Sequence, residues 1–228
     1  MDQPKALEPG TTSRAKLSNT LSEQGFALGN PAFIRLFKTE KRLELWLARN
    51  GQRFACFRHY PIRAFSGHLG PKLAEGDLQA PEGFYRVGIK QLNPRSRHHL
   101  AFNLGFPNVY DQALERTGSA LMVHGGCTSR GCYAMTDVLI EEIYVIVEAA
   151  LLAGQEAVDV QALPFVLTDG ALTHASTSPW FAFWTNLKQG FDLFEQTRTP
   201  PVVGACNGYY RFGSGLDAAG GDEIGYWR

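Results

Sequence analysis

Hydrophobic and polar residues alternate over much of the first quarter of the chain, and this alternation predicts β-strands. It is clear in segments 32–37 and 42–47 and continues through 53–62. A period of two places successive side chains on opposite faces of a sheet, whereas a helix repeats its apolar positions every three or four residues. Asn50-Gly51, a turn signal between the second and third segments, predicts an antiparallel meander.

Further apolar segments predict more strands after this meander. One begins after Gly83, and others span 100–106, 119–123 and 157–168. Glycine and proline interrupt residues 69–83 repeatedly, so we expect a loop there.

Three segments have the spacing of helices. Residues 14–24 predict a short amphipathic helix, and residues 179–194 predict an aromatic-rich helix that Gly190 weakens. The clearest helix begins at Thr136-Asp137, an N-cap signal, and ends at Gly154. Several strands with a few helices predict a mostly β (α+β) domain.

Composition divides the chain into three parts. We expect a polar N-terminal lead, residues 1–23, to be partly disordered, and it lacks the apolar core of a signal peptide. A glycine-rich tail is expected over 202–228, which leaves 24–201 as the folded domain. No apolar run approaches the roughly 20 residues that span a bilayer.

Charge and cysteine content exclude several classes of protein. The 22 basic side chains of lysine and arginine balance 22 acidic ones, so overall charge argues against binding to nucleic acid or to an anionic membrane. The four cysteines are too few for a disulfide scaffold in a chain of 228 residues.

The densest group of reactive side chains lies in residues 121–137, LMVHGGCTSRGCYAMTD, between a predicted strand and a predicted helix. Cys132 is the candidate nucleophile and His124 its candidate base, because a thiol needs a base within hydrogen-bond reach. Arg130 would favour the thiolate. The backbone N–H groups just ahead of the helix would stabilise an oxyanion, and they belong to Gly131, Cys132 and Tyr133.

Other interpretations of these residues stay open. A lone cysteine is commonly a small buried hydrophobe, and a lone histidine is commonly a structural polar residue. His124, Cys127 and Cys132 have the spacing of zinc ligands, although no fourth ligand is evident nearby. A disulfide between Cys127 and Cys132 is sterically possible and would block the nucleophile.

The order of these residues resembles the active-site signature of the L,D-transpeptidase catalytic domain (YkuD) family: His124-Gly125, then Ser129, then Gly131-Cys132. The resemblance covers about residues 24–201. The segments that match the YafK-like branch of the family are Tyr60–Ile62, Ser66-Gly67, Leu69–Lys72, Glu75–Asp77, Gln79–Tyr85, Asn93–Ser96, Phe106–Asn108, Gly131–Asp137, Leu163–Phe165 and Phe183-Trp184.

The resemblance implies a fold and a mechanism. The fold is a β-sandwich or barrel-like mixed sheet with a few helices packed on it. Cys132 would attack the carbonyl at the L-centre of diaminopimelate in a peptidoglycan stem peptide and form a thioester, with His124 as the base. The main-chain carbonyl of Gly125 would orient His124, and Ser129 would shape the loop. No metal or organic cofactor is implied.

The resemblance also implies partners and a location. The partners are peptidoglycan stem peptides and, for the YafK-like branch, a murein-bound lipoprotein whose C-terminal lysine is released from diaminopimelate by hydrolysis. A 3-3 cross-linking transpeptidase and a non-catalytic peptidoglycan-binding module remain alternatives. The implied location is the periplasm of the Gram-negative cell envelope.

Two positions depart from the family pattern. Many members carry arginine two residues after the cysteine, where this chain has Ala134, and histidine before Gly-Cys, where it has Arg130. Another cation would then bind the stem-peptide carboxylate, since guanidinium pairs with carboxylate bidentately. The candidates for that cation are Arg95, Arg97 and Arg130, and the candidates for lining the substrate groove are His99 and Asn103.

Overall fold

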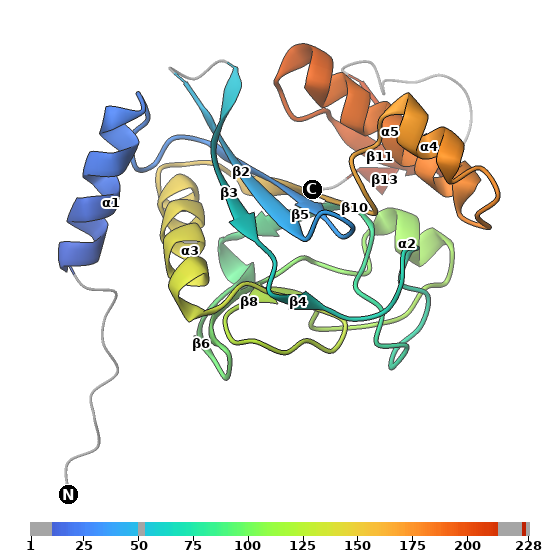
Figure 1. Ribbon diagram of the computed structural model, residues 1–228, viewed down its shortest axis with the longest axis horizontal. Coiled ribbons are helices and arrows are strands. Elements are labelled where there is room, and N and C mark those ends of the chain that lie inside the picture. The colour runs from blue at the N-terminus through green and yellow to red at the C-terminus, as the bar shows by residue number, and fades with distance from the viewer. Residues whose placement is uncertain (1–10, 50–52, 214–224, 227–228) are drawn as a thin grey trace, which may run out of the picture.

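The computed structural model describes residues 11–49, 53–213 and 225–226 (Figure 1). The predicted turn at Asn50-Gly51 and residues 1–10 of the predicted lead lie outside these ranges, whereas residues 11–23 of the lead form a helix. The helices are α1 (Thr11–Glu23), α2 (Val109–Ala113), α3 (Asp137–Leu152), α4 (Asp169–His174) and α5 (Phe181–Thr197), with a 3-10 turn, η1, at Ile89–Gln91.

Two five-stranded sheets form the body of the molecule, in the orders β3-β2-β1-β10-β5 and β4-β9-β8-β7-β6. β1 pairs in parallel with β10 and β8 with β9, whereas the other neighbours are antiparallel. The strands of the first sheet are β1 (Ala32–Phe37), β2 (Arg42–Ala48), β3 (Phe54–Pro61), β5 (Gly83–Gly88) and β10 (Ala157–Leu163). Those of the second are β4 (Ala64–Phe65), β6 (Leu92–Ser96), β7 (His99–Asn103), β8 (Met122–His124) and β9 (Tyr133–Ala134). Mixed sheets with a few helices confirm the predicted α+β class.

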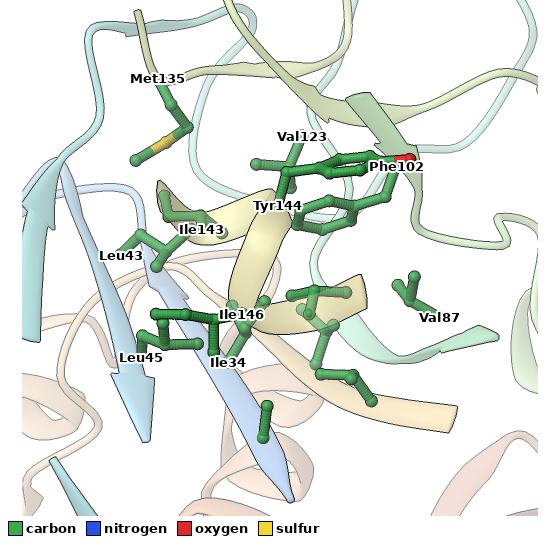
Figure 2. Packing of buried hydrophobic residues seen from close by; sticks show 14 of the residues in the cluster. Ile34, Leu43, Leu45, Val87, Phe102, Val123, Met135, Ile143, Tyr144 and Ile146 are labelled. Atoms are coloured by element: carbon green, nitrogen blue, oxygen red, sulfur yellow. The ribbon is translucent and has the colours of Figure 1, made fainter. Parts of the chain in front are cut away.

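The two sheets share one hydrophobic core with α3. The alternation of each strand turns one apolar set toward this core, including Ile34 of β1 and Val123 of β8, both fully buried. Figure 2 shows side chains of α3, such as Ile143, among those of both sheets. Burying one such side chain contributes roughly 1.5–3 kcal/mol, so this shared core holds the second sheet in place.

The opposite face of the first sheet packs against α5 and carries a buried charge. Arg35 is 4% exposed, and its guanidinium lies 2.6 Å from the carboxylate of Glu44. Four aromatic rings surround this guanidinium at 4.9–5.3 Å, those of Phe37, Trp46, Phe191 and Phe194. The ion pair and the ring faces together offset the cost of burying the charge.

The chain beyond α5 folds back onto the domain. β11 (Val203–Cys206), β12 (Tyr209–Phe212) and β13 (Gly225–Tyr226) form a third sheet. Tyr210 of β12 is 1% exposed, and Asn186 of α5 binds its backbone N–H at 2.7 Å. The predicted tail at 202–228 therefore begins with residues that pack into the body of the molecule, while the division into domains stays a prediction.

Other differences from the sequence analysis concern helix ends. α3 begins where predicted, but Thr136 has a φ of 71° and its side chain makes no capping bond. Asp137 instead accepts a hydrogen bond from the Gly126 N–H at 2.7 Å, which ties the helix start to the preceding loop. The strand predicted over 157–168 ends at Leu163, and α4, which was not predicted, follows it. None of the helices in the described ranges is long and apolar enough to cross a membrane.

Gly190 offers a test of how α5 packs. A Cβ at this position would lie 2.5 Å from the Phe212 ring and 2.6 Å from the Phe84 ring, whereas a Cβ at Gly170 of α4 would meet nothing within 4 Å. We expect Gly190→Ala to lower the free energy of unfolding by about 1–3 kcal/mol through overpacking, and Gly170→Ala to raise it by up to about 1 kcal/mol. Urea denaturation of both variants measures this, and equal effects would contradict the packing described.

Candidate active site

The second sheet presents its reactive side chains on the face turned away from the core. Val123 of β8 pairs with Tyr133 of β9, and both are fully buried. His124 pairs with Ala134, the next position on each strand, so its side chain projects from the opposite face. Cys132, two residues before Ala134, continues that same face. His124 and Cys132 therefore lie on one face of these neighbouring strands, and their roles as base and nucleophile stay predictions.

Burial and one hydrogen bond define the state of His124. Its side chain is 3% exposed, and Nδ1 lies 2.5 Å from the carbonyl oxygen of Gly125. A carbonyl only accepts, so Nδ1 carries the proton and Nε2 is left as a basic nitrogen. Burial lowers the pKa of His124 below 6.5, the Gly125 carbonyl partly opposes this, and nearby His98 adds to the lowering. At neutral pH the imidazole is therefore uncharged and able to take a proton.

Cys132 is half-buried and held in an apolar setting. Its Sγ accepts a hydrogen bond from the Met122 N–H at 3.4 Å and donates to the Ala120 carbonyl at 3.7 Å. Burial raises the pKa of the thiol above 9.0, against smaller lowering effects of the Met122 N–H and of Lys72. Arg130 is exposed and is not among the groups that shift this pKa. The cation that lowers this pKa is Lys72, and a role for Arg130 stays a prediction.

Ser129 and Ser66 hold the loop that presents Cys132. The Ser129 hydroxyl donates to the Cys132 carbonyl at 2.6 Å and accepts from the Cys132 N–H at 3.0 Å. The Gly131 N–H donates to the Ser66 hydroxyl at 2.5 Å. The predicted role of Ser129 in shaping the loop is consistent with these bonds. Two of the three N–H groups expected to be free for an oxyanion, those of Gly131 and Cys132, are occupied by hydroxyls.

The helix does not directly follow the cysteine. Tyr133, the third predicted oxyanion donor, belongs to β9, and this strand separates Cys132 from α3. The Tyr133 ring is buried, and its hydroxyl donates to the Pro81 carbonyl at 2.7 Å. The expectation that the N-terminus of α3 orients these donors was therefore wrong. The helix acts on the other end of the loop, through the bond between Asp137 and Gly126.

Comparisons with known proteins identify the family of this chain. The family model described as YkuD, L,D-transpeptidase catalytic domain, matches residues 32–162. The chain belongs to this family. A relative from Escherichia coli (strain K12), named "Putative L,D-transpeptidase YafK", is 46% identical over 183 residues, which are 80% of this chain and 74% of the relative. Family membership supports an enzyme with a peptidoglycan-related transpeptidase function.

Solved structures show more distant similarity. The helical cell shape determining protein Pgp2 from Campylobacter jejuni is 24% identical, with a TM-score of 0.46 over 65% of this chain and 55% of that chain. Its K307A mutant is 22% identical, with a TM-score of 0.49 over 82% of this chain and 65% of that chain. The match thus spans less than two thirds of the length of either solved chain.

The residues predicted to line the groove or to bind a carboxylate have different surroundings in the structure. His99 lies 2.7 Å from Glu141 of α3 through Nε2, so this ring is engaged with the helix. Asn103 shares the face of Cys132, but its side chain accepts the Gly105 N–H at 2.8 Å. Arg95, Arg97 and Arg130 are all exposed, and none forms an ion pair within the described ranges. Their role toward a carboxylate stays a prediction.

The sequence analysis missed two residues at this family site. The ring of His98 lies over that of His124, with centroids 4.6 Å apart. Lys72 is 3% exposed, and its ammonium donates to the Ala74 carbonyl at 2.7 Å and to Asp77 at 2.5 Å. The adjacent histidines His98 and His99 were a usable signal, but spacing alone does not show which of the two turns toward the base.

The alternative interpretations of the two loop cysteines are not supported by the geometry. Cys127 is exposed, Cys132 is half-buried, and both are free thiols. Within the described residues no three side chains of histidine, cysteine, aspartate or glutamate gather as metal ligands would, so His124, Cys127 and Cys132 do not form a zinc site.

Because Cys132 and His124 are both uncharged at neutral pH, the structure predicts how the rate of Cys132 alkylation depends on pH. Only the thiolate is alkylated, so the rate of iodoacetamide modification at Cys132 should rise through a pH above 9, the direction in which its pKa is shifted. The measurement follows the Cys132 peptide by mass spectrometry in a Cys127→Ser background. A rate already at its plateau at pH 7 would instead indicate a thiolate–imidazolium pair.

The effect of Lys72 on the pKa of Cys132 should be measurable in the same alkylation assay. Its ammonium lowers the pKa of Cys132, so we expect Lys72→Met to move the alkylation midpoint to still higher pH and Lys72→Arg to leave it nearly unchanged. Lys90→Met, at an exposed position of η1, is the matched control. Circular dichroism verifies folding, and an unmoved midpoint in folded Lys72→Met protein would remove Lys72 from the site.

Proposed function

We propose that this chain is a cysteine-dependent acyl transferase that acts on peptidoglycan stem peptides and forms a thioester at the L-centre of diaminopimelate. The observation that supports the proposal is the placement of Cys132 and His124 on one face of neighbouring strands, with the Nδ1 proton of His124 directed to the Gly125 carbonyl. This leaves Nε2 for the proton of the nucleophile, the arrangement that activates a thiol in covalent catalysis. Membership of the L,D-transpeptidase family supports the same chemistry.

The reaction proceeds in two acyl transfers. In the first, the Cys132 thiol gives its proton to His124 Nε2 while Sγ bonds to the diaminopimelate carbonyl carbon. The amine on the far side of that carbonyl leaves and takes the proton from His124. In the second, an acceptor gives a proton to His124 and attacks the thioester, which releases Cys132 as a thiol. Water as the acceptor gives hydrolysis, and an amine gives a new amide bond.

Hydrolysis of a diaminopimelate–lysine link to a murein-bound lipoprotein is the specific activity we infer. The 46% identity to the YafK relative, over most of both chains, favours the branch whose members resemble such hydrolases. The corresponding location is the periplasm of a Gram-negative envelope. A 3-3 cross-linking activity is the alternative outcome of the same thioester, and a non-catalytic peptidoglycan-binding module is the alternative without turnover.

The Met122 N–H is the backbone donor best placed to assist the first step. It already points at Sγ in the resting site, at 3.4 Å, so it stabilises negative charge on sulfur as the proton leaves. An oxyanion would need the Cys132 N–H, which Ser129 now accepts at 3.0 Å, to exchange partners. A change of the Ser129 side-chain rotamer moves its hydroxyl oxygen away from the Cys132 N–H, so substrate binding can free this donor.

Substitution of the two loop cysteines tests the mechanism with a matched pair. Cys132→Ala should abolish turnover, because the acyl group then has no attachment point. Cys127→Ser, five residues earlier in the same loop and exposed, should keep it. His124→Ala should lower kcat by about 10²–10⁴, the usual contribution of a general base. Products from diaminopimelate-containing muropeptides and from lipoprotein-bearing murein are identified by mass spectrometry.

The products separate the alternatives. Release of a peptide ending in lysine, with water added to the murein product, supports the hydrolase. Joined muropeptides without added water support cross-linking. Turnover that survives Cys132→Ala would refute the cysteine mechanism. If the unaltered protein shows neither turnover nor a Cys132 adduct with a carbapenem-type acylating agent, the chain is a binding module.

A further inference from the structure

A second site candidate lies on the side of the first sheet that faces α5. A cavity of about 200 Å³ opens between β5, β10 and the segment 200–203 that follows α5. The first sheet and the shared hydrophobic core separate it from the face that carries Cys132. The cavity is therefore distinct from the thiol site, and what it binds does not depend on the function proposed above.

Strand register gathers five side chains on the wall of this cavity. Phe33 of β1 pairs with Asp159 of β10, which pairs with Arg86 of β5. One step along the same face, Gln161 of β10 pairs with Phe84 of β5. Paired residues share a face, so an acid, a base and an amide lie together between two aromatic rings. Pro200 and Val203 close the opposite side.

Gln161 holds an acceptor that nothing in the described chain satisfies. Its side chain is 1% exposed, and Nε2 donates to the Gly190 carbonyl at 3.4 Å. Its carbonyl oxygen Oε1 is buried without any hydrogen-bond partner among the described residues. Buried polar atoms are nearly always paired, because an unpaired one has lost its water without compensation. A donor from outside the described residues is the partner this atom lacks.

Arg86 and Asp159 add a donor and an acceptor beside it. Their side chains lie 3.3 Å apart, Nε to Oδ1, and Arg86 also reaches Glu156 at 3.6 Å. Loss of hydration raises the pKa of Asp159 to about 6, against the lowering effect of Arg86. The wall therefore offers donor and acceptor groups side by side, which favours a ligand that both donates and accepts.

We propose that this cavity binds a small primary amide on an apolar body, with the amide N–H2 donating to Gln161 Oε1 and the amide carbonyl facing Arg86. An ammonium has no acceptor to offer Arg86, and a carboxylate would be repelled by Asp159 and by the bare oxygen of Gln161. A purely apolar ligand would leave that oxygen unpaired. The two phenylalanine rings and the proline and valine side chains enclose the apolar body.

Two matched probes test the donor requirement. Benzamide has the amide N–H2, whereas methyl benzoate has a similar size and ring but no N–H donor. Each is titrated into ¹⁵N-labelled protein, and binding is followed by chemical shifts of the Gln161 side-chain amide and of backbone amides in β5, β10 and 200–203. We expect saturable binding of benzamide and a Kd about tenfold or more higher for methyl benzoate.

Substitutions test whether the preference for benzamide depends on Gln161. Gln161→Met keeps the length of the side chain but removes the acceptor, and it should abolish the preference for benzamide. Gln112→Met, the same change at an exposed position of α2, should leave the preference intact. Should Gln161→Met fail to fold, Val203→Phe fills the cavity from the other side and should block both probes.

Three results would overturn the proposal. They are the absence of saturable shifts with benzamide up to its solubility, equal affinity for the two probes, and a preference that persists in folded Gln161→Met protein. The first result would mean that Oε1 is satisfied by an ordered water only. Turnover at Cys132 is measured separately, so failure here leaves the proposed function standing.

Discussion

A buried ion pair between Lys38 and Glu82 is the interaction on which much of the structure depends. Both side chains are 0% exposed, and Nζ lies 2.9 Å from Oε1. The ammonium also donates to the carbonyls of His68 and Gly70, and the carboxylate accepts from the Gly70 N–H and the Trp184 indole. Burial lowers the pKa of Lys38, although Glu82 opposes this. A pair so fully hydrogen-bonded is tolerated in a core, but losing one partner of such a pair costs about 3–5 kcal/mol. It joins the end of β1, the approach to β5, and α5.

The same pair governs the thiol site through the loop between β4 and β5. Lys38 binds two carbonyls near the start of this loop, Glu82 lies at its end, and the loop supplies three contacts to the other sheet. Ser66 accepts the Gly131 N–H, and the Pro81 carbonyl accepts the Tyr133 hydroxyl. Lys72, braced by Asp77, provides the cation that acts on Cys132. The conformation of the cysteine loop is thus set by residues 50 to 65 positions earlier in the chain. A change in the packing of α5 against Glu82 can reach the site by this route.

Apolar patterning made the strands of the first sheet and α3 predictable, and a compact motif marked Cys132 and His124 as the candidate pair, whose roles stay predictions. Segment 42–47 alternates over most of its length, whereas 32–37 has one polar residue, Arg35, and is buried at every position because both faces of the first sheet are covered. The α3 segment keeps one apolar face over its whole length, so there local pattern and tertiary burial agree. The predictions failed at positions whose structure depends on contacts between segments that are distant in the sequence. A two-residue strand such as β9 has no periodicity, so the oxyanion donors were assigned to a helix start. Lys72 has no sequence neighbour that marks it as the thiol's cation. The glycine at 190 signalled a weak helix, yet it is the residue that lets Phe84 and Phe212 approach α5.

Burial, and not a nearby arginine, determines the resting state of the nucleophile and its base. The same apolar surroundings raise the pKa of Cys132 and lower that of His124, so both shifts favour the uncharged forms. In the proposed mechanism an uncharged pair holds no standing thiolate, and the thiolate forms only as the proton moves to Nε2 during attack. Exposed Cys127 lies in the same loop, and a half-buried thiol with a high pKa is slow to oxidise against such a neighbour. The sheet face that aligns the two residues therefore also protects the thiol until a carbonyl is in place.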